Sequence, residues 1–116
     1  MEFTFNISPL HADALRIDLK GRLLSKDQAE ELMLAADTEI ANGKNKFIIS
    51  LEALEFINSA GLSSLISLLT KARKSNGEVA IFGTNKRIEE LLVLTKLNTV
   101  FNIFKTEGEA LQNINK

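Results

Sequence analysis

From residue 47 onward, short apolar runs alternate with segments in which apolar residues recur every three or four positions. Residues 47–51 and 79–82 are nearly continuous apolar runs, which is typical of strands covered on both faces. The segments that follow each run have the spacing of amphipathic helices. Strands and helices that alternate in this way build a parallel sheet through crossover connections. The pattern therefore predicts an α/β fold.

The beginning of the chain shows a different pattern, with a period of two. Phe3, Phe5 and Ile7 alternate with polar residues, and the same alternation returns over residues 15–19. Residues 8–13, which include the only Pro and the only His, are predicted to form a turn between the two runs. An antiparallel hairpin of this kind makes the sheet mixed.

Four helices are expected between and after these strands. Asp27 is predicted to cap a helix that runs to about residue 42, and the next two helices are expected over residues 60–75 and 86–96. A last strand over residues 100–104 precedes a short helix, which a capping box from Thr106 to Glu109 opens. The prediction is a single-layer mixed sheet of about five strands, packed with about four helices, in one domain over residues 1–116.

Composition excludes several classes of function. The chain lacks Cys, has a formal net charge of −1 and shows no basic stripe, which disfavours thiolate metal sites and direct nucleic-acid binding. No segment reaches the ~18 consecutive apolar residues of a membrane span, and the first residues do not resemble a signal peptide. We expect a cytoplasmic protein with no membrane insertion, no bound metal and no cofactor.

The most informative segment covers residues 54–62, where an apolar stretch leads into a helix. Asn58 and Ser59 are both good helix-capping residues, and the positive end of the helix dipole suits an anion there. A phosphate on Ser59 would be compatible with the fold, although a simple cap needs no function. Gly61 has two interpretations: an opening that lets another surface approach Ser59, or close packing of the helix onto the sheet.

This segment resembles the signature of the STAS domain family, in which a strand leads through an apolar loop into Asp-Ser-x-Gly-Leu at a helix start. Here the corresponding residues are 58–62, Asn-Ser-Ala-Gly-Leu. Gly21, Arg22 and Leu23 are similar to the family's Gly-Glu-Leu before the first helix, and residues 78–92 fit its later half. The resemblance covers nearly the whole chain and implies a STAS-like fold.

The resemblance also implies a function: that of a bacterial anti-sigma factor antagonist. Such proteins bind a serine kinase that sequesters a sigma factor; the kinase phosphorylates the motif serine, and a PP2C-like phosphatase reverses the modification. Ser59 corresponds to that serine. The implied partner-binding residues are Asn58, Ser59, Ala60, Gly61, Leu62, Ser63 and Leu24.

Two residues depart from the family pattern, which usually has Asp where this chain has Asn58 and Leu24. Asn keeps the capping oxygen without the negative charge, and Leu24 is expected to orient nothing near the serine. A non-phosphorylated STAS subunit of a lipid-transport ABC system is therefore the alternative function. Weak homodimer formation is a further expectation.

A few other residues suggest roles of their own. Catalysis by a Ser-His-Asp triad would need His11 next to Ser59, and His11 is expected on a different loop, so we predict no enzymatic activity. Ser64 is a weaker alternative phosphorylation site. Residues 91–94, Leu-Leu-Val-Leu, exceed what one buried helical stripe holds, so one or two of them are expected to face outward.

Overall fold

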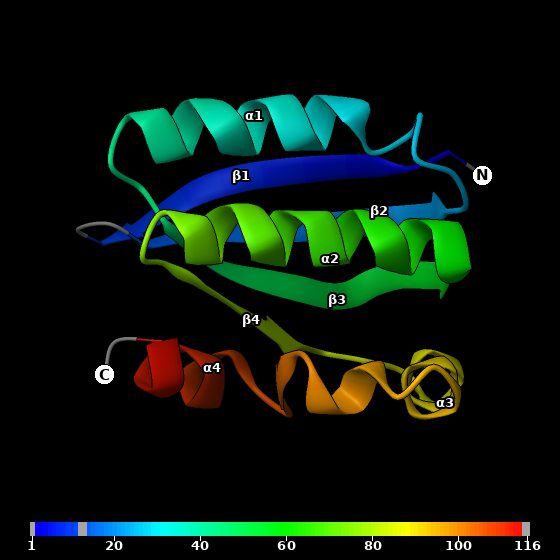
Figure 1. Cartoon of the computed structure of the whole chain (residues 1–116). Coiled ribbons are helices and arrows are strands. Elements are labelled where there is room, and N and C mark those ends of the chain that lie inside the picture. Colours follow the sequence, from blue (N-terminus) through cyan, green and yellow to red (C-terminus); the bar gives the residue numbers. More distant parts are fainter. Residues whose placement is uncertain (1, 12–13, 115–116) are drawn as a thin grey trace.

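The computed structural model describes residues 2–11 and 14–114 and confirms the predicted order of strands and helices. The elements are β1 (Thr4–His11), β2 (Ala14–Leu23), α1 (Glu30–Ala41), β3 (Lys46–Ile57), α2 (Ser59–Lys74), β4 (Glu78–Phe82), α3 (Lys86–Leu94), the 3-10 helix η1 (Leu97–Thr99), β5 (Asn102–Phe104) and α4 (Glu107–Ile114). Figure 1 shows α1 and α2 running alongside the strands, with α3 and α4 gathered beyond β4.

The strands form a mixed sheet in which spatial order follows chain order, β1-β2-β3-β4-β5. β1 pairs with β2 antiparallel, and each later pair is parallel. The predicted hairpin followed by parallel β-α-β units is therefore confirmed. In a parallel arrangement the carboxyl ends of β2, β3 and β4 share one edge of the sheet, where ligands and partners of open α/β folds usually bind.

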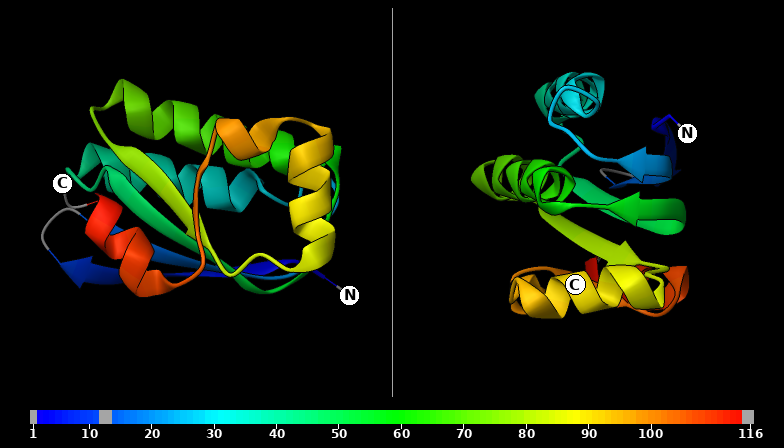
Figure 2. Two further views of the ribbon diagram at one scale, coloured as in Figure 1. Left: turned by 90° about the horizontal axis from the view of Figure 1, so that it is seen from below. Right: turned by 90° about the vertical axis from the view of Figure 1, so that its right-hand side faces the viewer.

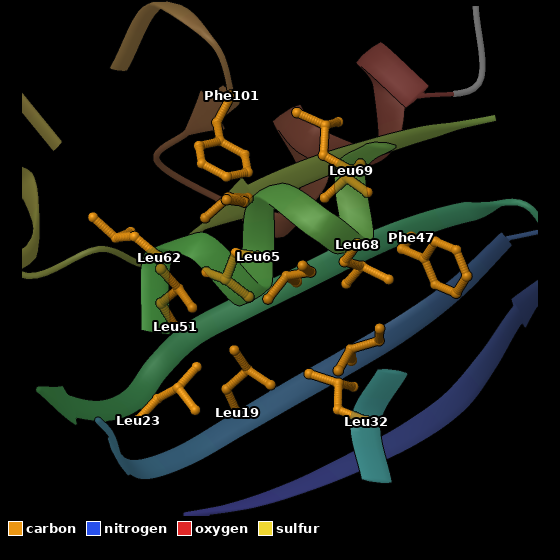
Figure 3. Packing of buried hydrophobic residues seen from close by; sticks show 14 of the residues in the cluster. Leu19, Leu23, Leu32, Phe47, Leu51, Leu62, Leu65, Leu68, Leu69 and Phe101 are labelled. Carbon is orange, nitrogen blue, oxygen red and sulfur yellow. The ribbon is translucent and has the colours of Figure 1, made fainter. Parts of the chain in front are cut away.

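Alternating side chains of the central strands face two separate apolar clusters. Phe47 and Ile49 of β3 face the large cluster beneath α1 and α2, whereas Ile48 faces a smaller cluster beneath α4. Figure 2 shows α1 and α2 side by side as one layer. Figure 3 shows leucines of α2 packed against those of β2 and β3. Both faces of the sheet centre are thus covered, as the continuous apolar runs predicted.

Three strands are clearly longer than predicted, and β2 is one of them because it runs to Leu23. β1 continues to His11, with an irregular register near Pro9, so the turn expected over residues 8–13 is wrong for its first four residues, and residues 12–13 lie outside the described part. Pro9 is tolerated because β1 is an edge strand. β3 extends to Ile57, which pairs with Leu23, so the apolar stretch expected to be a loop is strand.

The start of α1 also differs from the prediction, because Asp27 does not cap it. A capping box precedes the helix: the Ser25 hydroxyl accepts a bond from the Gln28 amide at 3.3 Å, and the Gln28 side-chain oxygen accepts one from the Ser25 amide at 3.2 Å. One further turn then leads to Glu30. The Gln28 side chain also donates to the Arg22 carbonyl, which ties this loop to the end of β2.

The end of the chain shows smaller differences. Residues 97–99 form η1. β5 begins at Asn102 rather than at residue 100, and Phe101 is buried outside the strand. The third helix is shorter than predicted: α3 ends at Leu94, and Thr95 follows it in an exposed position. The capping box at Thr106 is confirmed by a 3.2 Å bond from the Glu109 amide to the Thr106 hydroxyl.

Arg16 fastens α4 to the sheet. Its guanidinium makes ion pairs with Asp18 on β2 and with Glu107 on α4, and it lies 5.4 Å from the centre of the Phe82 ring. The hydrogen bond to Asp18 is the main cause that raises the pKa of Arg16. α4 therefore combines a small apolar cluster with one charged anchor.

Two leucines of α1 offer a matched test of this core. Leu32 is 0% exposed and Leu34 is 60% exposed. We expect Leu32→Ala to lower the free energy of unfolding by about 2–5 kcal/mol, because it leaves a cavity. Leu34→Ala should change it by less than about 0.5 kcal/mol. Urea denaturation measures both, and equal losses would contradict the packing described for α1.

Candidate functional site

The candidate site lies at the carboxyl edge of the sheet, where β3 ends and α2 begins. Ile57, the last residue of β3, pairs with Leu23, the last residue of β2. Asn58 follows in an extended conformation, and α2 starts at Ser59. The resemblance placed the motif serine at the start of a helix, and the structure places Ser59 there.

The side chain of Asn58 joins α2 to the loop that follows β2. Its amide oxygen accepts a hydrogen bond from the Gly61 amide at 3.0 Å, which caps the helix. Its amide nitrogen donates to the carbonyl of Leu24, also at 3.0 Å. A carboxylate at this position would accept the first bond but could not donate the second. Asn58 therefore holds the two segments together through both ends of its amide.

This second bond corrects the expectation that Leu24 orients nothing near Ser59. The Leu24 side chain is half-buried and makes no polar contact, but its backbone is held on both sides. Its amide donates to the Gln28 side chain at 2.7 Å, and its carbonyl accepts from Asn58. The backbone of Leu24 thus positions the helix cap, a role that side-chain chemistry alone did not indicate.

The serines of α2 differ in exposure. Ser59 is exposed, and Ser63, one turn later, is half-buried. Ser64 is only 4% exposed, and its hydroxyl donates to the Ala60 carbonyl at 3.3 Å. A kinase could not reach Ser64 in this conformation, which weighs against the alternative phosphorylation site. Ser59 presents the most accessible hydroxyl near the start of the helix.

Gly61 and Leu62 lie underneath the segment rather than on its surface. Leu62 is 2% exposed, and Gly61 is buried. A methyl group added to Gly61 would lie 2.5 Å from the carbonyl oxygen of Leu23 and 2.6 Å from the Ile57 side chain. These contacts support the interpretation that Gly61 allows close packing of the helix. They do not support the interpretation that Gly61 leaves an opening for a partner. These two residues support the segment from below.

A groove of about 300 Å³ separates the start of α2 from α3. Ser59 lies on one wall with Phe56 and Asn58, and Arg87, Leu91 and Leu94 lie on the other. Leu94 is 80% exposed and Val93 is 60% exposed, which confirms that residues 91–94 exceed the buried stripe. The groove thus joins a hydroxyl to an exposed apolar helix face.

Sequence reasoning missed Arg22, Phe56 and Arg87 as members of this surface. The guanidinium carbon of Arg22 lies 5.6 Å from the centre of the Phe56 ring, and that of Arg87 lies 5.7 Å from it. These are cation–π distances. Arg22 and Phe56 are register partners on β2 and β3, but nothing local in the sequence brings Arg87 to them.

The backbone pairing separates His11 from Ser59. His11 pairs with Ala14 at one end of β2, whereas Ser59 follows the Leu23–Ile57 pair at the other end. Ten residues of strand lie between, roughly 30 Å at the usual rise per residue. A catalytic triad built from His11 and Ser59 is therefore incompatible with the topology.

Comparison with known proteins agrees with the fold and the motif. A family model described as the STAS domain matches residues 11–110. A Thermotoga neapolitana protein named as a candidate anti-sigma factor antagonist is 30% identical over 78 residues, which cover 67% of this chain and 69% of that protein. The chain therefore belongs to the STAS domain family.

Solved structures show the same architecture. An anti-sigma factor antagonist from Mycobacterium paratuberculosis superposes with a TM-score of 0.82 at 22% identity, covering 99% of this chain and 96% of that one. The Bacillus cell fate determinant SpoIIAA in its phosphorylated form gives 0.74 at 18% identity, covering 96% and 99%. At these identities the likeness establishes the shared fold.

No described helix is long and apolar enough to cross a membrane.

Replacing the two helical glycines by Ala should have opposite effects. Gly61→Ala is expected to lower the free energy of unfolding by about 1–3 kcal/mol, because the new methyl group meets the Leu23 carbonyl. Gly108→Ala on α4 has no atom nearer than 3.9 Å and should stabilise by about 0.5–1 kcal/mol. Thermal or urea unfolding distinguishes them, and a stable Gly61→Ala protein would contradict the close contact.

Substitutions at Asn58 test its two hydrogen bonds. Asn58→Ala removes both and should lower the free energy of unfolding by about 1–2 kcal/mol. Asn58→Asp keeps the cap on Gly61 but loses the donor to Leu24, so its loss should be smaller. Urea denaturation ranks the three proteins. If Asn58→Asp were as stable as the parent, the predicted order of stability would be wrong.

Proposed function

We propose that this protein is an anti-sigma factor antagonist whose partner binding is switched by phosphorylation of Ser59. The supporting observation is an exposed hydroxyl on one wall of a groove whose other wall combines the exposed Leu94 with the charged residues Arg87 and Glu90. The segment beneath it is held by Asn58 and Gly61, so Ser59 has a defined position. The relatives named above support the choice of partner class.

In the unmodified state the Ser59 hydroxyl carries no charge. The exposed side chain of Leu94 supplies apolar contact area beside the polar start of α2, and exposed Val93 adds apolar area on an adjoining part of α3. A surface with an apolar centre and a polar edge is typical of a protein interface. The partner is an anti-sigma factor with serine kinase activity, which releases its sigma factor when the antagonist binds.

The switch itself is a phosphoryl transfer. The Ser59 oxygen forms a bond to the γ-phosphorus of ATP, the bond from that phosphorus to the bridging oxygen breaks, ADP leaves, and the hydroxyl proton is released. The product carries about −1.5 to −2 charges near neutral pH. Charge placed in an interface without compensation costs several kcal/mol and releases the partner.

A PP2C-like phosphatase reverses the modification. Water attacks the phosphorus, inorganic phosphate leaves, and the serine hydroxyl is restored. Both reactions are carried out by partners, so this chain acts as their substrate and needs no cofactor of its own. ATP-dependent switching of a sigma factor places the proposed pathway in the cytoplasm.

The non-phosphorylated subunit of a lipid-transport system is less well supported. The departures at Asn58 and Leu24 suggested it, but the amide of Asn58 keeps the helix cap and adds a bond to the Leu24 carbonyl. The named relatives are also antagonists rather than transport subunits. We therefore favour the switching role.

Phosphate mapping tests the site. The chain is incubated with ATP and an anti-sigma factor kinase from its own genome, and peptides are analysed by mass spectrometry. We expect one phosphate, on Ser59, because it is the exposed serine in the groove at the start of α2, whereas Ser63 is half-buried, Ser64 is buried and Ser67 lies two turns away. Ser59→Ala should abolish labelling, whereas the matched Ser63→Ala should retain it. Phosphate on another serine, or none, would contradict the proposal.

Binding to the same kinase tests the switch. Ser59→Asp should weaken binding on the order of 100-fold or more, as expected when a charge enters an interface without a partner. Ser67→Asp, on an exposed part of α2 two turns away, provides the matched control and should bind like the parent. Isothermal titration calorimetry measures the kinase affinity of the parent protein and of both variants. Undiminished binding by Ser59→Asp would refute the switching mechanism.

A further inference from the structure

Two arginines beside Phe56 have no carboxylate partner within the described part of the chain. Arg22 and Arg87 both lie against the Phe56 ring, and among residues 2–11 and 14–114 neither side chain makes an ion pair. Arg16 and Arg73, in contrast, each pair with acidic side chains. A guanidinium is well suited to bind phosphate oxygens through two parallel hydrogen bonds. The two guanidinium groups beside the Phe56 ring are therefore able to bind a phosphate, because neither is paired with an acidic side chain among the described residues.

Arg87 shares a groove with Ser59. It belongs to the first turn of α3 and lines the wall opposite Ser59, whereas Arg22 extends from the end of β2 and does not line the groove. Arg87 is exposed, so its long side chain can leave the ring at little cost. The amide of Gly61 at the start of α2 is already bonded to Asn58 and does not compete for the anion.

We propose that Arg87 binds the phosphoryl group of phosphorylated Ser59 across the groove, so that the modification closes the groove from within the same chain. This inference rests on the proposed function, since it concerns the phosphorylated state of that site. Binding would move the guanidinium from the Phe56 ring to the start of α2. One guanidinium compensates only part of the phosphate charge, so the modified protein would still present net negative charge to the partner. It would also lack the neutral hydroxyl and the free arginine that the partner meets in the unmodified state.

The charges around the groove determine how strong this contact is. Arg22, which also lies against the Phe56 ring, adds a second positive charge, and Glu90, which lines the same wall as Arg87, opposes the phosphate. Lys86 is the residue before Arg87, carries the same charge and is exposed, but it lines a neighbouring hollow with Leu94 and not the groove of Ser59. Lys86 therefore provides a matched control for charge without contact.

The test installs phosphoserine at position 59 during translation, so no kinase is required. The second pKa of the phosphate, ordinarily about 6, is followed by phosphorus NMR. Arg87→Gln should raise this pKa by roughly half a unit or more, because a nearby guanidinium favours the dianion. Lys86→Gln should leave it nearly unchanged, and Glu90→Gln should lower it.

A second measurement reports the contact directly. The side-chain NεH resonance of Arg87 should shift when Ser59 is phosphorylated, and that of Arg22 should shift less. Equal pKa changes in Arg87→Gln and Lys86→Gln would indicate only long-range attraction and would overturn the proposal. An unchanged pKa in Arg87→Gln would overturn it as well. Because the phosphate is installed without a kinase, neither result depends on whether Ser59 is a natural substrate.

Discussion

The contact between the first turn of α2 and the end of β2 fixes the whole candidate surface. Gly61 lets the helix backbone rest on the Leu23 carbonyl, where any side chain would intrude. Asn58 then bonds to both sides of this junction. With the junction fixed, Ser59 faces outward and Leu62 faces the core. A helix shifted by one residue would be rotated by about 100° and would place other side chains at these two positions, so the accessibility of the serine follows from backbone packing.

Much of the fold could be predicted from the sequence because the signals are local. Continuous apolar runs identified the central strands, and three-and-four spacing identified the helices. The predicted start of α1 was wrong because the capping box of Ser25 and Gln28 lies a full turn before the first residue of regular helix. The length of β3 was underestimated because pairing with β2, rather than local propensity, extends it to Ile57.

Only part of the candidate site could be predicted from the sequence. Asn58 and Ser59 are adjacent residues of a motif, and local chemistry indicates that a cap lies here; the structure assigns it to Asn58. Arg87 reaches Phe56 only because the topology brings the start of α3 beside the end of β3, a proximity that no short-range pattern encodes. The departure from the usual Asp also has a structural reason. The amide of Asn58 donates to Leu24, where a carboxylate would meet a carbonyl oxygen.

The sheet divides the interior into unequal parts, and this has a consequence for local motion. α4 contacts the small cluster of Ile48, Ala80 and Phe82, while α2 rests on the larger cluster across the sheet. Opening of α4 would break the Arg16–Glu107 pair and expose only that smaller cluster. Segments that open separately form distinct units of cooperativity. We therefore expect α4 to open as a separate unit, while the candidate site around Ser59, which rests on the larger cluster, keeps its packing.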